Sequence, residues 1–282
     1  MKGEVVSFRT SDGLKLWGLY SPAARRTDRC IVYIHGLGGS LFGQLTAVVG
    51  EHAMRAGWNF LAFNNRGSGT IIGLNNRRGK WVSVGAALER FADTTKDVRG
   101  ALKFLQARGN RRFVLAGHST GCQKSIYYQS KTHDKRVEAL VLLGPVSDRD
   151  SSIKQMGRKK WTRTLALAKR MVKAGRGTGL MPGGELSARR FWELHNQRSV
   201  EGNIFDYAGG KLTLLSRIRV PILAIYGSRD QHTAYGHAKE LAMLARNNPC
   251  VLTALVNGAR HGFEKHEVKA AKLVLSWLNN VI

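Results

Sequence analysis

Residues 113–121 read Phe-Val-Leu-Ala-Gly-His-Ser-Thr-Gly. The apolar run predicts a buried strand, and a helix-compatible run follows the last glycine. A Gly-x-Ser-x-Gly motif in this context is typical of a sharp turn between strand and helix. Small residues two positions before and after Ser119 would let the two elements approach closely, with the serine hydroxyl exposed. An ordinary glycine-rich turn with a helix-capping serine is the other interpretation of the motif taken alone.

The rest of the chain alternates between strand and helix patterns. Apolar runs predict strands at residues 5–9, 14–20, 30–34, 59–64, 112–116, 138–143, 220–226 and 250–256. Helical patterns follow Ser119 and fall at residues 41–55, 93–108, 234–246 and 265–282. In the last helix Val268, Ala271, Leu275 and Leu278 should share one apolar face. The alternation predicts an α/β fold with a mostly parallel sheet, helices on both of its faces and an antiparallel hairpin at its start.

Residues 148–219 break this alternation. The segment is helical in parts, and between Arg149 and Arg219 it carries 16 Lys and Arg against 5 Asp and Glu. It lacks the low-complexity composition of a linker. We therefore expect a single domain, with a core formed by residues 1–147 and 220–282 and an insertion formed by residues 148–219.

Candidate partners for a nucleophilic serine follow the last two predicted strands. A serine hydroxyl needs a general base, an orienting acid and donors for the developing oxyanion. His261 comes just after the last strand, and Asp230 comes just after the strand before it. The carboxyl ends of parallel strands meet at one edge of the sheet, so we expect both beside Ser119 as base and acid. The backbone N–H groups of Leu37 and Thr120 are the expected oxyanion donors.

This ordered set of motifs resembles the α/β-hydrolase superfamily over nearly the whole chain. His35-Gly36 after the third strand resembles the oxyanion loop of that family. Residues 65–69, Asn-Arg-Gly-Ser-Gly, resemble its Arg-Gly-x-Gly turn, with Asn where the family often has Asp. The resemblance implies an eight-stranded sheet with a helical cap inserted after strand six, at residues 148–219. It also implies that His35, Gly36 and His118 shape the site.

The same resemblance implies a chemistry. A Ser-His-Asp triad would cleave a carboxylic ester through an acyl-enzyme, with no cofactor or metal. Asp148 follows the sixth strand and is the alternative acid, because some members of the superfamily place the acid there. Thioester, amide or carbon–carbon cleavage and acyl transfer use the same machinery and stay open. Residues 117–123 and 187–230 further resemble a fungal siderophore-esterase-like branch.

Composition limits the class of protein. The chain has 282 residues, of which 43% are hydrophobic, so it should fold as a globule. We find no apolar run of the roughly 18 residues that a membrane span needs, and no segment like a secretion signal. The three cysteines form no CxxC pair, which argues against a zinc site and favours a reducing compartment. The expected location is cytoplasmic.

The net charge of +26 leaves two interpretations open. A strongly basic protein can have an anionic partner, such as nucleic acid, a membrane surface or an acidic substrate. The basic residues are spread along the chain, however, and this favours a generally basic surface without a specific nucleic-acid partner. We expect a small-molecule acyl substrate, with an anionic one as an alternative. The oligomeric state stays open.

Some motifs of the chain also occur in two other classes of protein. Residues 36–39, the following helix and strand, and Arg66 could form a unit that binds the 2′-phosphate of NADP. Tyr127 and Lys131 even have the spacing of the catalytic pair of short-chain dehydrogenases. The third glycine of that fingerprint is missing, since Leu occupies position 41, and the pair would lie deep in the helix after the motif serine. A binding protein on a hydrolase scaffold would more naturally have lost the serine, histidine or acid.

Overall fold

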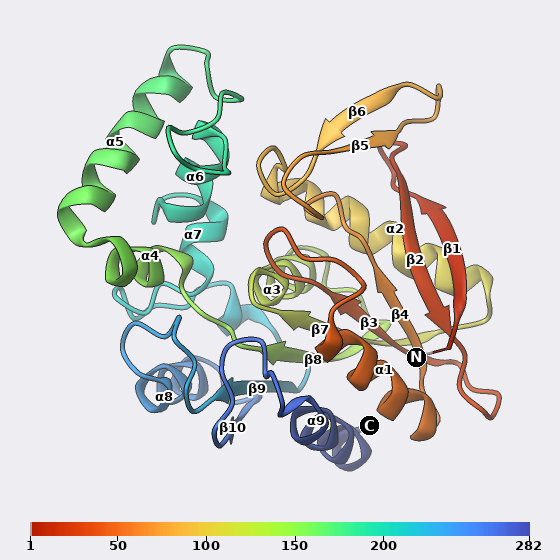
Figure 1. Cartoon of the computed structure of the whole chain (residues 1–282). Coiled ribbons are helices and arrows are strands. Elements are labelled where there is room, and N and C mark those ends of the chain that lie inside the picture. The colour runs from red at the N-terminus through yellow and green to blue at the C-terminus, as the bar shows by residue number, and fades with distance from the viewer. Residues whose placement is uncertain (1) are drawn as a thin grey trace.

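The main sheet has eight strands in the computed structural model, which describes residues 2–282 (Figure 1). The strand order is β1-β2-β4-β3-β7-β8-β9-β10. Its strands span Glu4–Arg9 (β1), Lys15–Ser21 (β2), Arg29–Ile34 (β3), Asn59–Phe63 (β4), Arg112–His118 (β7), Val137–Leu143 (β8), Ile222–Gly227 (β9) and Val251–Val256 (β10). β1 and β2 are antiparallel, β2 is antiparallel to β4, and the others pair in parallel. The expected mostly parallel, eight-stranded sheet is confirmed.

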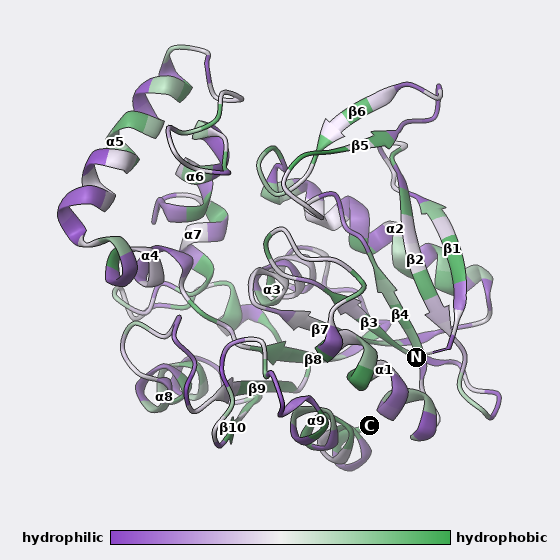
Figure 2. Ribbon diagram, in the orientation of Figure 1, coloured by the Kyte–Doolittle hydropathy of each residue, from purple (hydrophilic) through white to green (hydrophobic). Residues whose placement is uncertain are grey.

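The central strands are continuous apolar runs because both of their faces are covered. β4 and β9 are buried at every position, and so is β3 after its first residue. Figure 2 shows green, hydrophobic residues along β4, β8 and β9. Strands of a parallel sheet covered on both faces have this pattern, whereas half-exposed strands alternate. β10 at the edge of the sheet is only partly buried.

Helices cover both faces of the sheet. Their bounds are Gln44–Arg55 (α1), Thr94–Ala107 (α2), Thr120–Thr132 (α3), His237–Asn247 (α8) and Glu267–Val281 (α9). α1 and α9 share one hydrophobic core with the sheet, and α2, α3 and α8 share the other. On α9, Ala271 and Leu275 are buried as expected. Val268 is 47% exposed, so it does not belong to the buried face.

Four helices lie between β8 and β9. They span Asp148–Met156 (α4), Arg158–Lys173 (α5), Ala188–His195 (α6) and Val200–Ile204 (α7), and Figure 1 shows them to one side of the sheet, with α5 outermost. Ala168 of α5, Met181, and Ala188 and Phe191 of α6 form a small hydrophobic core of their own. Residues 151–184 contain nine Lys or Arg and no Asp or Glu.

One element has no counterpart among the sequence-based expectations. Residues Ile72–Asn75 (β5) and Trp81–Val84 (β6) form a separate two-stranded antiparallel sheet. The side chain of Trp81 covers Gly73 on the opposite strand and is still 74% exposed. The hairpin follows the carboxyl end of β4, just as α4 follows that of β8.

The cysteines are all unlinked. Cys30 and Cys122 are fully buried, and burial raises the pKa of both thiols well above the usual value. Cys250 is partly exposed at the start of β10. Among the described residues, no helix is long and apolar enough to cross a membrane.

Candidate active site

Ser119 lies on a strained turn between β7 and α3. Its φ of 54° and ψ of −124° are unusual for a residue other than glycine. A Cβ atom on Gly117 would collide with the carbonyl oxygen of Gly121, and one on Gly121 would collide with that of Ile34. The Ser119 amide donates to the carbonyl of Leu143 at 2.9 Å. Glycine is therefore required on both sides of the serine, as the sequence motif predicts.

The loop after β3 lies directly against this serine. A Cβ atom on Gly36 would be 2.8 Å from the Cβ of Ser119. The amide of Gly39 donates to the carbonyl of Gly36 at 3.1 Å, and the hydroxyl of Ser68 donates to the carbonyl of Gly39 at 2.9 Å. Thr120 is the first residue of α3, and the first amides of a helix have no partner within it. The loop after β3 and the first turn of α3 thus both lie beside the serine.

His35 fastens this loop to the end of β4. Its Nδ1 donates to the carbonyl of Gly36 at 2.8 Å, and its Nε2 accepts from the amide of Asn65 at 3.2 Å. This pattern requires the neutral ring with its proton on Nδ1. Burial, together with the charge of Lys124, lowers the pKa of His35 to about 4. His35 therefore stays neutral at neutral pH and contributes structure to the site.

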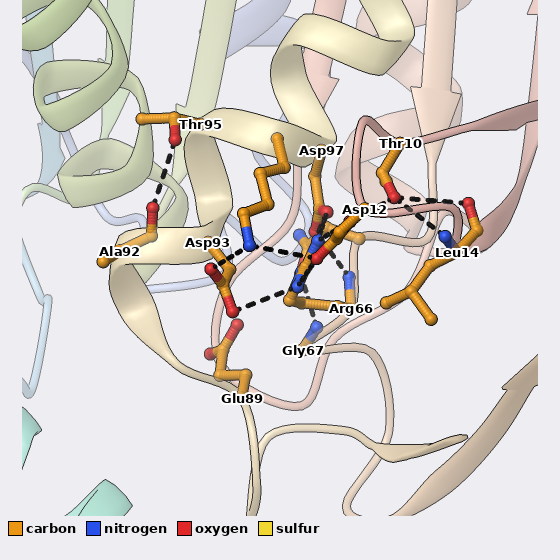
Figure 3. A network of polar contacts seen from close by, with 12 residues as sticks. Thr10, Asp12, Leu14, Arg66, Gly67, Glu89, Ala92, Asp93, Thr95 and Asp97 are labelled. Carbon is orange, nitrogen blue, oxygen red and sulfur yellow. Dashed lines mark hydrogen bonds and ion pairs between the residues drawn. The ribbon is translucent and has the colours of Figure 1, made fainter. Parts of the chain in front are cut away.

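Arg66, the candidate ligand for a 2′-phosphate, is already occupied (Figure 3). Its guanidinium donates to Asp97 at 2.7 and 2.9 Å, to Asp12 at 3.0 Å and to Asp93 at 3.2 Å. Its amide also donates to Asp97, at 2.9 Å. Three carboxylates around one buried guanidinium hold the loop after β4 in place. These three carboxylates outweigh the single positive charge of Arg66, so the residue would not attract a phosphate group.

His261 and Asp230 are brought together by the loops after β10 and β9. The Nδ1 of His261 donates to Oδ2 of Asp230 at 2.8 Å, and the amide of His232 donates to the other carboxylate oxygen at 2.8 Å. Burial opposes ionisation of Asp230, but the hydrogen bond and charge of His261 outweigh it, so the pKa of Asp230 is lowered. Gly144 makes room for the imidazole, since a Cβ there would be 2.9 Å from Cε1 of His261.

His118 supports His261 from the other side. Its Nε2 donates to the backbone carbonyl of His261 at 3.0 Å, and the two ring centroids are 5.1 Å apart. Burial and the charge of His261 lower the pKa of His118 to about 4. The neutral His118 ring thus fixes the backbone that carries His261.

Asp148, the alternative acid, has a different partner. It lies at the start of α4 and accepts a hydrogen bond from Nε2 of Gln123 at 2.7 Å. Burial and then the charge of Glu201 raise the pKa of Asp148 to about 7. The two candidate acids thus lie in different environments, and it is Asp230 that bonds to His261.

Two cavities at this site share Leu37 in their walls. A cavity of about 400 Å³ is lined by Ser119, His261 and Leu37 among others. A second one, of about 470 Å³, lies between the core and helices α4–α6, where Leu37 again forms part of the wall together with Asp148 and His232. Leu37, the expected oxyanion donor, therefore borders both. Ser119 is exposed to the first cavity, as a nucleophile must be.

Sequence reasoning missed His232. Its ring packs edge-on against His261, with 4.5 Å between the centroids. Its Nδ1 is 3.0 Å from the hydroxyl of Ser151 and 3.0 Å from Nε2 of Gln155, both on α4. Its position two residues after Asp230, in the same loop, was the available signal. His232 links the histidine of the site to the helices between β8 and β9.

A chain of buried charges also escaped prediction. Lys124 of α3 bonds to Glu89 at 2.8 Å, Glu89 bonds to Arg190 of α6 at 3.0 Å, and Arg190 pairs with Glu201 of α7 through both carboxylate oxygens. All four side chains are at most 1% exposed. We call this the buried charge chain. It joins the helix that begins after Ser119 to two helices of the 148–219 segment.

A protein-family model, described as "Protein of unknown function (DUF1749)", matches residues 84–281, which is more than half of the chain. The chain belongs to the DUF1749 family. The matched region of this DUF1749 protein includes Ser119, Asp230 and His261 but not the loop after β3. No curated protein matches the sequence.

Solved structures with the same fold include three hydrolases by name. The esterase Pf2001 of Pyrococcus furiosus is 19% identical, with a TM-score of 0.65 over 99% of this chain and 91% of that chain. A thermostable carboxyl esterase of Bacillus coagulans is 15% identical, with a TM-score of 0.70 over 100% and 99%. A soluble variant of monoglyceride lipase from Saccharomyces cerevisiae is 16% identical, with a TM-score of 0.67 over 99% and 96%. The DUF1749 protein thus has the α/β-hydrolase fold, and its expected resemblance to that superfamily is confirmed.

Proposed function

We propose that this DUF1749 protein is a serine hydrolase that cleaves carboxylic esters, with Ser119, His261 and Asp230 as its catalytic triad. The 2.8 Å bond between His261 and Asp230, made where His261 and the strained Ser119 line one cavity, carries this proposal. The esterase and lipase names of the structural neighbours are in keeping with it. Their fold alone would not decide the chemistry, because one fold hosts many activities.

The reaction uses only groups of the chain and water. His261 takes the proton of the Ser119 hydroxyl, whose oxygen attacks the acyl carbon. The resulting oxyanion accepts hydrogen bonds from the amides of Leu37 and Thr120. His261 then gives its proton to the leaving alcohol, and an acyl-enzyme remains. A water molecule, deprotonated by His261, attacks the acyl carbon in turn, and Ser119 regains its proton as the carboxylic acid leaves. Asp230 holds the imidazole tautomer and stabilises its protonated form.

We assign the binding of the rest of the substrate to a cap formed by residues 148–219, inserted in a core of residues 1–147 and 220–282. The cavity of about 470 Å³ supports this, since its lining comes from both parts and reaches Leu37 and His232 beside the triad. Its volume suits a small-molecule acyl substrate. Lys160, from the basic run of the cap, also lines it and would favour an anionic acyl group. The three unlinked cysteines suit a cytoplasmic location.

A labelling experiment tests the nucleophile. A fluorophosphonate probe should modify Ser119, and Ser119→Ala should lose roughly 10³-fold or more of the rate on p-nitrophenyl esters while staying folded. Ser276→Ala, which changes an exposed serine of α9, is the matched control and should behave like the wild type. Labelling at another residue, or an active Ser119→Ala protein, would exclude the mechanism. A panel of esters of increasing chain length then defines the acyl group.

A further inference from the structure

A third cavity lies at the opposite edge of the sheet from Ser119. Its volume is about 830 Å³, and its lining includes the first residue of three parallel strands, namely Arg29 of β3, Asn59 of β4 and Arg112 of β7. Ser119 instead follows the carboxyl end of β7. The cavity is therefore separate from the proposed active site. We call it the arginine pocket, because its lining contains Arg25, Arg26, Arg29, Arg108, Arg111 and Arg112, with Asp28 as the single acidic residue.

Only two of these six arginines form an ion pair with a carboxylate among the described residues. Arg108 pairs with Glu4 at 2.6 Å and Arg112 pairs with Glu138 at 2.7 Å. Arg29 stacks over the ring of Trp58, with 5.3 Å to its centroid. Within residues 2–282, the remaining three, Arg25, Arg26 and Arg111, make no ion pair with a carboxylate, and all are exposed. Cations of one sign gathered around a concave surface repel one another and attract anions.

A buried amide holds the walls of the arginine pocket in place. The Oδ1 of Asn59 accepts from the amide of Ala23 at 2.9 Å, and its Nδ2 donates to the carbonyl of Thr27 at 3.1 Å and to Oδ1 of Asn110 at 2.7 Å. The amide of Arg111 donates to the carbonyl of Asp28 at 2.8 Å. The two loops that carry the unpaired arginines are thus fixed to each other and to the sheet. A preformed site of this kind loses little conformational entropy when it binds a ligand.

The chemistry of the lining indicates the ligand. A guanidinium presents a planar fork of N–H donors that fits phosphate oxygens two at a time. Several unpaired forks on one concave wall suit a ligand with several phosphate groups in a short chain. The basic face of α5 differs, because it is a convex helix surface of the kind that attracts any polyanion. We propose that the arginine pocket is a binding site for a compact oligophosphate, such as a free diphosphate or triphosphate or the phosphate chain of a nucleotide.

Calorimetry with sodium tripolyphosphate as the probe tests this proposal at a constant ionic strength of about 0.15 M. Wild-type protein should bind one tripolyphosphate per chain, at least about tenfold more tightly than orthophosphate. Arg26→Gln/Arg111→Gln should weaken this binding by about tenfold or more, because charge-assisted hydrogen bonds to the phosphates are lost. Both side chains are exposed and form no ion pair, so the variant should unfold at the wild-type temperature without ligand.

The control removes the same charge elsewhere. Arg163→Gln/Arg170→Gln changes two exposed arginines of α5 and should leave the affinity within about twofold. Ser119→Ala should bind tripolyphosphate like the wild type, so failure of the proposed triad would not affect this result. Equal losses in the two double variants would overturn the proposal in favour of diffuse attraction. Displacement of tripolyphosphate by a single-stranded oligonucleotide at equal phosphate concentration would overturn it in favour of nucleic acid.

Discussion

Replacing Arg190 by Met should destabilise the protein more than any surface substitution. The change keeps an unbranched, flexible side chain, although a shorter one, and removes the cation that bonds to Glu89 and Glu201 inside the protein. Burial already raises the pKa of Glu201 in spite of Arg190. Removing one partner of a buried ion pair costs about 3–5 kcal/mol, because a buried charge is left without compensation. For a chain of this size, that corresponds to a fall of roughly 6–20 °C in the melting temperature.

A second substitution in the buried charge chain should partly restore stability. Without Arg190, Lys124 faces two carboxylates, whereas Arg190→Met/Glu201→Gln leaves Lys124 and Glu89 as a balanced pair. The double variant should therefore be more stable than Arg190→Met. Arg163→Met, on the exposed side of α5, is the control and should change the unfolding free energy by no more than about 0.5 kcal/mol.

The pH dependence gives the sign of the effect. Without Arg190, the folded-state pKa of Glu201 is raised above its unfolded value. Its contribution to the unfolding free energy is therefore present at low pH and is lost as the pH rises through the folded-state pKa. The loss of unfolding free energy in Arg190→Met, relative to the wild type, should therefore grow from acidic to neutral pH. Urea unfolding followed by circular dichroism at several pH values measures it. A loss below about 1 kcal/mol, or a double variant less stable than the single one, would refute the argument that the buried carboxylates need the cation of Arg190.

Four further outcomes follow from the site. Asp230→Asn should lower kcat by roughly 10³- to 10⁴-fold, whereas Asp148→Asn should change it little; the reverse ranking in steady-state kinetics would give the acid role to Asp148. Because the raised pKa of Asp148, about 7, implies stability that is lost as the pH rises through 7, Asp148→Asn should gain unfolding free energy over the wild type above pH 7 but not near pH 4. Gly36→Ala should abolish ester hydrolysis in a folded protein, since its Cβ would be 2.8 Å from that of Ser119, and full activity with an unchanged melting temperature would count against the packing described here. If the basic cap attracts anionic esters, their kcat/KM should fall with added salt while that of a neutral ester of equal length stays constant, and parallel salt profiles would exclude this steering.

The strands could be predicted because their burial is two-sided. A parallel strand between helices is a continuous apolar run, and the runs at residues 30–34, 59–64 and 112–116 correspond to β3, β4 and β7 within two residues. The β5–β6 hairpin was missed because each of its strands has only four residues and lies outside the core. Val268 was misplaced because it lies at the margin of the buried face of α9, where Glu267 and Ala270 in the same turn are buried and Val268 is 47% exposed.

The site was predictable to the extent that the fold makes it so. Chain order alone places the loops after β7, β9 and β10 at one edge of a parallel sheet, and this brings Ser119, Asp230 and His261 to one place. The buried charge chain could not be predicted in the same way. A lysine or glutamate in a sequence is normally a surface residue, and only the fold brings Lys124 and Glu89, 35 positions apart, within bonding distance.

The three thiols differ sharply in their surroundings, and this has a practical consequence. Cys30 and Cys122 are shielded from solvent and resist ionisation, whereas Cys250 is partly exposed at the sheet edge. Because the thiolate is the reactive species, alkylating dyes should react with the native protein at Cys250 and spare the other two until it unfolds. The unmodified chain therefore carries its own attachment point for a fluorophore, remote in sequence from Ser119. The delayed reaction of Cys30 and Cys122 would in turn record opening of the core, without any engineered cysteine.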